Sequence, residues 1–427
     1  RLMKYLLTLK SFLNQDRSWA FRAMMLLAAG ALVVGLWARL FNLGFPPRLM
    51  FDELYFPDFA RKFLQGIYEF DLHPPLGKFL IAASMALLGD NPFAWRWMPA
   101  VFGCLMIPLG ALVGWYLFKE RVAALLLGTF VAGETFLVAY SRTGVMDGFL
   151  VFFMLATLLA ALMVERRREV IWVAVLLGLS IAVKWAVFMV AIPVGYVLWR
   201  KGLFRQFLAS LWISAVVYLA VVYIGALVSI TSNPLQAWVW MWGWHLQAAE
   251  RITAAIPNPL ASPWWSWPLM LHPIRFWYSL PAENPGIVRT ISSIGNPILW
   301  WSSTLAVIAG LLELVRLKLI SRKPIADHPL VPIVLGYVFL LLPWVPGTRI
   351  PYIYNYLPSY AFALLALVYW MCVLWRRRPG GPWVVVAFTA CAVAIFLFFL
   401  PMATGFPMTH QGMQWRVWLE SWSPEPR

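Results

Sequence analysis

The sequence predicts an all-α polytopic membrane protein, on three observations. Of its 427 residues, 62% are hydrophobic and only 12% are charged, which leaves too little polar surface to coat a soluble globule. Apolar runs of roughly 20 residues, the length that crosses a bilayer, recur along the chain. Basic residues gather in every second connection between these runs. We therefore expect one integral membrane domain over 1–427 with about 11 transmembrane helices.

The predicted spans follow one another from residue 22 to residue 400. They cover 22–44, 96–118, 122–140, 146–164, 170–184, 185–199, 205–230, 294–315, 329–345, 355–375 and 382–400. The fifth and sixth are short and meet at Lys184. They are either two half-length spans or one span with a re-entrant piece.

The orientation of these spans follows from the connections rich in Lys and Arg, which stay on the cytoplasmic side. This rule puts the N-terminus inside, and the short basic stretches around 119–121, 166–168 and 376–378 as well. The external face then receives a long first loop at 45–95, a second loop at 231–293 and a C-terminal tail at 401–427. The net charge of +16 is thus mainly a topology signal, and no nucleic-acid partner or cleavable signal peptide is expected.

No metal or cofactor is expected from the cysteines and histidines. All three cysteines fall inside predicted spans, where they are typical small packing residues. The five histidines form neither an HExxH motif nor a cluster.

The first external loop begins with adjacent carboxylates, Asp52 and Glu53, followed by an amphipathic segment. Apolar residues from Phe56 to Ile67 recur at helical spacing. Pro57 suits a first helical turn, and Gly66 suits a C-terminal stop. The helix should lie in the membrane interface and hold the acidic pair at headgroup depth. By itself, such a pair is more often a solvated end of a span.

Further motifs in the sequence favour a functional role for this acidic pair. After the acidic pair comes FDLHPPL (70–76), and six more blocks follow in order. These are RWMPAVFGCLMIPLG (96–110), SRTGVMDGFLVFF (141–153), GLSIAVKW (178–185), ASPWWSWPL (261–269), IGNPILWW (294–301) and RIPYIYNYLPSYAF (349–362). In this order they resemble the protein O-mannosyltransferase family, membrane enzymes of the GT-C fold. The 231–293 loop is too short for the β-trefoil of eukaryotic members, so the resemblance is to the compact bacterial type. Asn355 stands where many relatives carry His.

The resemblance implies an inverting transferase that needs no metal. It would move a sugar, mannose in this family, from a polyprenyl phosphate in the membrane to Ser or Thr of exported proteins. The active site would face the periplasm or exterior of a bacterial plasma (inner) membrane. Two alternatives stay open: a related transferase acting on a lipid or polysaccharide acceptor, and a polyprenyl-lipid flippase or transporter. No oligomeric state is predicted.

Glycosyl transfer to a hydroxyl needs a carboxylate base and cations for the leaving phosphate. The family's first acidic position corresponds to Asp52, the expected base, and Glu53 would orient the acceptor or an arginine. Arg96 is the expected cation that keeps Asp52 ionised. The predicted phosphate-binding residues are Arg96, Arg142, Lys184, Arg349 and Lys78, although a snorkelling side chain at a span end needs no such role.

The remaining predicted site residues are expected to contact the acceptor or shape the loops. These are His73, His245, Trp264 and Trp265. Asp147 is either a helix cap or a partner of Arg142, and we favour the pairing. Glu134 lies inside the third span, where a carboxylate is costly unless paired, so it either lines the donor cavity or makes a buried structural contact.

Overall fold

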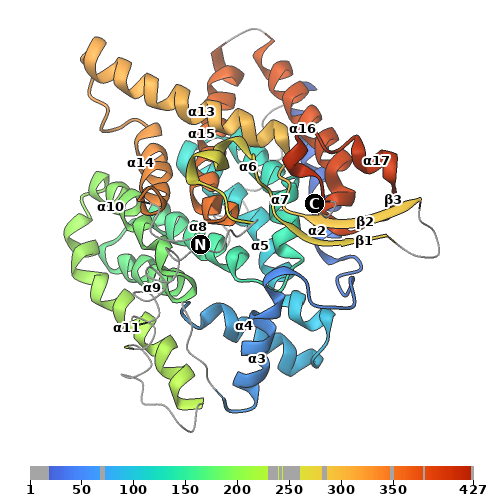
Figure 1. Cartoon of the computed structure of the whole chain (residues 1–427). Coiled ribbons are helices and arrows are strands. Elements are labelled where there is room, and N and C mark those ends of the chain that lie inside the picture. The colour runs from blue at the N-terminus through green and yellow to red at the C-terminus, as the bar shows by residue number, and fades with distance from the viewer. Residues whose placement is uncertain are drawn as a thin grey trace.

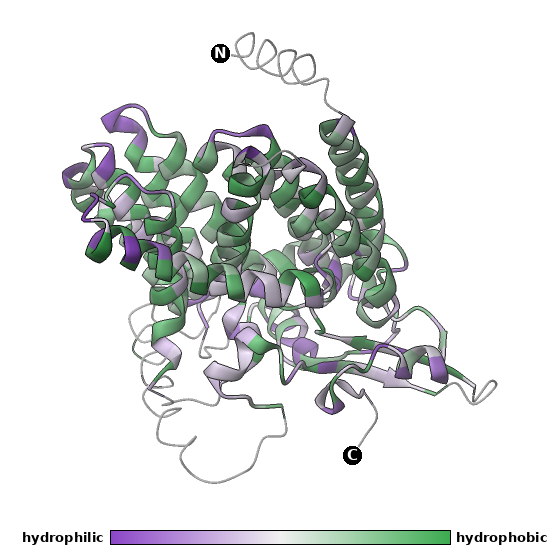
Figure 2. Cartoon of the chain, turned by 90° about the horizontal axis from the view of Figure 1, so that it is seen from above, coloured by the Kyte–Doolittle hydropathy of each residue, from purple (hydrophilic) through white to green (hydrophobic). Residues whose placement is uncertain are grey.

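The computed structural model describes residues 19–67, 73–228, 260–280, 286–346, 351–377 and 380–424, together with Val239 and Gly243. Helices form a bundle, and a small sheet lies beside one end of it (Figure 1). Hydrophobic residues dominate the bundle, whereas the sheet and C-terminal segment carry more polar residues (Figure 2). This distribution fits a multi-pass membrane protein with an ordered extramembrane layer.

Six of the described helices are long and apolar enough to cross a membrane. They are α2 (Trp19–Leu40), α5 (Pro92–Phe118), α11 (Phe204–Val228), α13 (Pro297–Val315), α15 (Leu357–Arg377) and α16 (Gly381–Thr404). A pair, α6 (Arg121–Ala132) and α7 (Thr135–Ser141), passes the same test together but is bent by 57°.

Shorter apolar helices fill the other predicted spans. They are α8 (Asp147–Met163), α9 (Val170–Val183), α10 (Ala191–Arg200) and α14 (Leu330–Leu341). Each of the eleven predicted segments thus contains a helix, and the helical membrane class is confirmed. Only six or seven meet the length test for a span, so the count of eleven stays a prediction. The predicted break at Lys184 is present: its backbone is extended between α9 and the 3-10 segment η3 (Trp185–Val190).

Buried polar side chains explain the bend between α6 and α7. Arg39 of α2 is fully buried and donates to the last two carbonyl groups of α6, at 2.8 and 3.1 Å. Glu134 caps α7 by accepting from an N–H of its first turn. The Glu134 carboxylate also accepts from the Asn296 N–H at 2.8 Å and the Tyr360 hydroxyl at 2.6 Å. These contacts satisfy backbone groups that a broken helix leaves exposed, and Glu134 makes the buried structural contact rather than lining a cavity.

The loop at 45–95 contains the predicted helix as α3 (Phe56–Leu64), with Pro57 in its first turn. Gly66 follows with φ of +76°, a conformation that favours glycine. A second helix, α4 (Leu76–Leu88), packs on α3, and the rings of Phe63 and Phe79 lie 4.5 Å apart. Ile67 stays exposed. The aromatic side of α3 therefore packs mainly on protein, with an apolar edge left for the interface.

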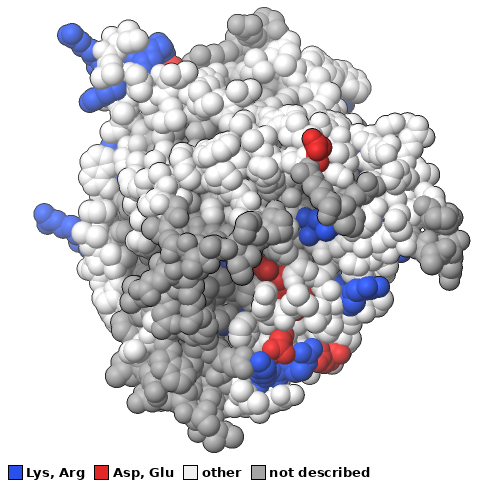
Figure 3. Space-filling view, in the orientation of Figure 1, with Lys and Arg blue, Asp and Glu red and all other residues white. Residues whose placement is uncertain are grey.

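Ion pairs hold α3 to the turn after α4. Arg61 contacts Asp90 at 2.5 Å and Asp58 at 3.3 Å, and Lys62 contacts Asp58 at 3.0 Å. Basic and acidic side chains lie side by side in one group near the lower edge of the molecule in Figure 3. The first loop is thereby fixed to the start of α5.

A three-stranded antiparallel sheet was not predicted. Its order is β1 (Arg275–Ser279), β2 (Ile287–Ser292), β3 (Met408–Thr409), with a bulge in β1. Strands this short give almost no periodic signal. The sheet joins the segment predicted as a loop at 231–293 to the C-terminal segment 401–427. Short helical elements complete this layer: η4 (Trp264–Leu269), α17 (His410–Gln414) and η8 (Glu420–Trp422).

Candidate active site

Asp52 and Glu53 lie together in a single 3-10 turn, η1 (Phe51–Leu54), but their side chains meet different environments. Glu53 is fully buried. Asp52 is half-buried, and no side chain in the described ranges forms a hydrogen bond or ion pair with its carboxylate. Adjacent residues of a tight helical turn point in directions about 120° apart, so one carboxylate enters the protein and the other faces the site.

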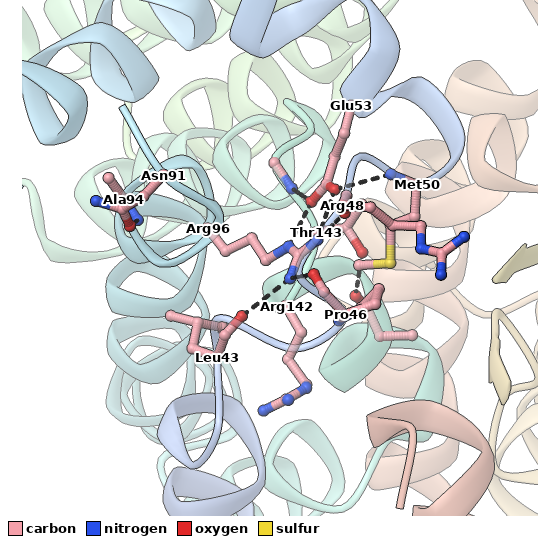
Figure 4. Close-up of polar contacts among 12 residues, drawn as sticks. Leu43, Pro46, Arg48, Met50, Glu53, Asn91, Ala94, Arg96, Arg142 and Thr143 are labelled. Carbon is pink, nitrogen blue, oxygen red and sulfur yellow. Dashed lines mark hydrogen bonds and ion pairs between the residues drawn. The ribbon is translucent and has the colours of Figure 1, made fainter. Parts of the chain in front are cut away.

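The buried Glu53 carboxylate forms a saturated centre with Arg96 of α5 (Figure 4). Its two oxygens accept from the Arg96 guanidinium at 2.7 and 2.9 Å. The same oxygens accept from the Gly144 N–H at 2.7 Å and the Met50 N–H at 3.1 Å. Glu53 thus ties the first loop to α5 and to the turn after α7. It orients an arginine, one of the two roles expected, and has no exposed oxygen for an acceptor.

Arg96 uses every guanidinium N–H inside the protein. Besides Glu53, it donates to the carbonyl oxygens of Leu43, Pro46 and Arg48 at 3.0 to 3.2 Å. The side chain has no exposed surface. This geometry differs from both expectations for Arg96, since it leaves no donor for a phosphate and pairs the cation with Glu53 rather than Asp52.

Arg142 caps the C-terminus of α2. Its guanidinium donates to the carbonyl oxygens of Ala38, Phe41 and Asn42 at 2.7, 2.8 and 3.2 Å. A cation at the negative end of a helix is favourable. Arg142 is buried and does not pair with Asp147, so the favoured Arg142–Asp147 pairing was wrong.

Asp147 pairs instead with Lys184, with Nζ 2.7 Å from Oδ1. The Lys184 ammonium also lies 4.8 Å from the centre of the Tyr354 ring. Both members of the pair line a cavity of about 780 Å³. The break between α9 and η3 explains why a lysine can stand there: its side chain leaves the helical stack and reaches the cavity.

The lining of the cavity is largely apolar and includes a few polar side chains. His73, Asp147, Lys184, Tyr218 and Asn355 supply the polar groups. Most other lining residues are apolar and come from η3, the end of α14 and the turn that follows it, and several are aromatic or proline. The volume lies within the ~300–1,000 Å³ of typical small-molecule sites. Such a lining suits a ligand with a charged group and a hydrophobic chain.

Asp52 lies near the Lys184–Asp147 pair that lines this cavity. Phe51 contacts the cavity-lining Tyr354, with ring centres 6.3 Å apart. Burial raises the pKa of Asp52 to about 6; the positive charge of Lys184 opposes this rise, and the negative charge of Asp147 adds to it. The cation near Asp52 is therefore Lys184, and it does not cancel the effect of burial. A carboxylate with this pKa is a competent base near neutral pH.

The other predicted site residues are divided between this cavity and its surroundings. His73 lines the cavity. Lys78 is buried, donates to the His73 carbonyl oxygen at 3.1 Å and lies 4.7 Å from the Phe59 ring centre. Trp264 is half-buried and Trp265 is exposed, and neither is among the lining residues. Arg349 and His245 lie outside the described residues.

Comparison with known proteins then fixes the family. Models of dolichyl-phosphate-mannose-protein mannosyltransferases match residues 31–95 and 72–228. A model of the C-terminal four TMM region of protein-O-mannosyltransferase matches 234–422. The chain belongs to the protein O-mannosyltransferase family. It is accordingly a glycosyltransferase, and the transporter alternative is wrong.

Bacterial members of the family match along most of their length. The polyprenol-phosphate-mannose–protein mannosyltransferase of Mycobacterium tuberculosis is 25% identical, over 87% of this chain and 86% of the relative. The protein of that description from Mycolicibacterium smegmatis is 23% identical, over 96% and 94%.

The fold of this chain is similar to that of solved GT-C structures. The Saccharomyces cerevisiae Pmt1-Pmt2 complex bound to the sugar donor matches with a TM-score of 0.81 and 17% identity, over 94% of this chain and 92% of that one. ArnT from Cupriavidus metallidurans, bound to undecaprenyl phosphate, matches with a TM-score of 0.55 and 15% identity, over 88% and 70%.

Two tyrosines at or beside the cavity were not predicted from the sequence. Tyr354 carries the ring under Lys184, and Tyr140 of α7 packs against Tyr354 and β1. Tyr354 lies beside Asn355 in a quoted motif, so its place at the cavity could have been suspected. Tyr140 gave no signal, because an aromatic residue in an apolar helix is ordinarily core.

Proposed function

We propose that this chain transfers mannose, with inversion, from a polyprenyl phosphate carrier to Ser or Thr hydroxyls of exported proteins. One observation carries the proposal most directly. Among the described side chains, the Asp52 carboxylate has no hydrogen-bond or ion-pair partner, and it lies near the Lys184–Asp147 pair that lines a largely apolar cavity. The names of the bacterial relatives supply the donor and acceptor classes.

In the proposed reaction, Asp52 accepts the proton of the acceptor hydroxyl as its oxygen attacks the anomeric carbon. The bond between that carbon and the phosphate oxygen breaks, and the polyprenyl phosphate leaves with the electron pair. Lys184, which lines the cavity, would stabilise the negative charge that develops on this phosphate. Its hold by Asp147 and by the Tyr354 ring fixes the ammonium before the ligand arrives.

Glu53, Arg96 and Arg142 then act by positioning. Glu53 and Arg96 fix the turn that presents Asp52, and Arg142 fixes the end of α2 beneath it. Lys78 is proposed to shape the loop through the His73 carbonyl group. Arg349 and His245 keep their predicted phosphate and acceptor roles, and Trp264 and Trp265 keep a role in acceptor contact.

The active site is proposed to face the periplasm or exterior of a bacterial plasma membrane, with the N-terminus in the cytoplasm. The support is the alternation of basic connections in the sequence. Single cysteines at Gln65 and Arg167 would test it in cells, after the three native cysteines are replaced. An impermeant thiol reagent should label the first and not the second; labelling only at Arg167 would reverse the orientation.

The activity is tested by incubating the purified protein with defined polyprenyl phosphate sugars and a Ser/Thr peptide. Mass spectrometry should find one hexose on the hydroxyl residue with the mannose donor, and none with Asp52→Asn. A lipid or polysaccharide acceptor is offered in parallel, since transfer to it alone would favour the alternative acceptor class. A further arm with a chelator tests the proposal that no metal is needed, and loss of activity that added metal restores would refute it.

A further inference from the structure

Tyr140 has a buried hydroxyl that the reaction scheme above does not use. The residue is 1% exposed, and within the described chain its hydroxyl has no hydrogen-bond partner. A buried hydroxyl left unpaired costs about 1–3 kcal/mol. Phenylalanine would fill the same space without that cost, so the hydroxyl calls for an explanation.

The position of Tyr140 supplies one. Its ring stacks on Phe136 at 4.7 Å and meets Phe276 of β1 edge-on at 5.1 Å. It also lies 6.4 Å from the ring of Tyr354, which lines the cavity beneath Lys184. Phe276 in turn stacks on Phe51 at 4.7 Å, next to Asp52. Tyr140 is thus held firmly between the base and the cavity.

The charges around the hydroxyl indicate what it could bind. The Tyr354 ring, whose centre lies 6.4 Å from that of Tyr140, also lies 4.8 Å from the Lys184 ammonium. Tyr354 thus contacts both Tyr140 and the cation that is proposed to face the phosphate, and Asp147 holds that cation at 2.7 Å. A phenol hydroxyl can donate to an anionic oxygen, and such bonds are stronger than neutral ones.

We propose that Tyr140 is a further ligand-binding residue of this site, whose hydroxyl donates a hydrogen bond to a phosphate oxygen of the lipid-linked donor. The inference rests on the proposed function, because that function supplies the phosphate. The hydroxyl is shielded from solvent in the structure. Tyr354 contacts Tyr140 and lines the cavity, so a shift of the Tyr354 ring is the movement that would open it to the ligand.

Tyr140→Phe separates this role from simple packing, because the two predict opposite balances of stability and activity. The variant keeps the aromatic contacts and removes an unpaired group, so its midpoint of thermal unfolding should stay the same or rise. Its affinity for a polyprenyl monophosphate should fall on the order of 10-fold, with a comparable or larger loss in transfer rate.

Tyr360→Phe is the matched control. It lies on α15 and is also fully buried, but its hydroxyl donates to Glu134 at 2.6 Å. Removing that hydroxyl should lower the unfolding midpoint, the opposite of Tyr140→Phe. A midpoint that falls equally in both variants would show that the Tyr140 hydroxyl is structural and would overturn the inference.

The experiment titrates wild type and Tyr140→Phe with polyprenyl monophosphate and with polyprenyl phosphate mannose. Weaker binding of both ligands to the variant supports the phosphate contact. A deficit confined to the mannose-bearing ligand would place the hydroxyl on the sugar and refute the contact as stated, as would equal affinities with equal turnover. If the wild-type protein binds neither ligand, the proposed function is wrong, and this outcome differs from all those that test Tyr140.

Discussion

Two neighbouring carboxylates, Asp52 and Glu53, lie within one turn of the loop at 45–95, and their surroundings differ. The Glu53–Arg96 centre is fully buried, and every guanidinium N–H donates inside the protein. The Asp52 carboxylate is half-buried and lacks a partner among the described side chains, and the nearby Lys184–Asp147 pair opens on a cavity. The two carboxylates therefore differ in what they leave available to a ligand. Glu53 and Arg96 use their hydrogen-bonding groups inside the protein and fix the backbone, whereas the Asp52 carboxylate is free to react with a ligand.

The largest effect should come from breaking the saturated centre. Glu53→Gln leaves a buried arginine without its counter-charge, which costs about 3–5 kcal/mol in comparable pairs. We expect a much lower unfolding midpoint and yield in detergent, with activity lost in proportion to folded protein. Replacing both partners, as in Glu53→Leu with Arg96→Met, should cost less than the single change. A Glu53→Gln protein of normal stability and no activity would move Glu53 into the chemistry.

The second effect concerns the unsaturated carboxylate. Asp52→Asn should reduce transfer by on the order of 10²-fold or more, the scale of general-base removal. Its stability should not fall at pH 7.5, because burial disfavours the ionised form and raises its pKa to about 6. Initial rates and thermal unfolding on one preparation check both statements. Turnover of Asp52→Asn near the wild-type rate would show that Asp52 is not the general base.

The third effect separates the cations. Lys184→Gln should weaken inhibition by polyprenyl phosphate by roughly 1.5 to 3 kcal/mol, the usual value of a hydrogen bond to a charged group. Arg142→Gln is the matched control, since its guanidinium binds backbone carbonyl groups of α2. It should lose stability while its folded fraction keeps the wild-type inhibition constant. Equal loss of inhibition in both would return Arg142 to the phosphate site.

The smallest effect is in the pH dependence. Only ionised Asp52 can accept the proton, so kcat/KM should fall below pH 6, roughly tenfold per unit. Asp147→Asn removes a negative charge that raises the Asp52 pKa, so the acid limb should move to lower pH. Lys184→Gln removes a positive charge that lowers this pKa, and its limb should move to higher pH. An acid limb near pH 4 in wild type would contradict the raised pKa.

The helices were predictable because they depend on local hydrophobic pattern. All eleven apolar segments contain a helix, and the expected start of α3 at Pro57 and stop at Gly66 are present. The sheet was missed because its strands are short and β3 contributes two residues from 116 positions or more beyond the end of β2. Pairing over that distance leaves no trace in a local pattern.

The site was predicted in its residue types but not in its partnerships. Asp52, Lys184 and His73 were named for the site and lie at or beside the cavity. Arg96 and Arg142 were named from their place at span ends, which cannot reveal that their donors are used by carbonyl groups. Asp147 pairs with Lys184 and not with the predicted Arg142. This pairing depends on the path that the chain takes after the break at the end of α9, which the sequence does not specify.

The pairing of β2 with β3 has a consequence for how the enzyme is made. β3 follows α16, so the sheet gains its third strand only after every helix from α2 to α16 has been synthesised. Trp422 then donates to the Met270 carbonyl oxygen at 2.7 Å, and its indole packs near Trp301. The layer whose Phe276 contacts Phe51 beside Asp52 is therefore closed by a strand that is synthesised after all of these helices. The helices that line the cavity can therefore be in place before the sheet beside Asp52 is complete.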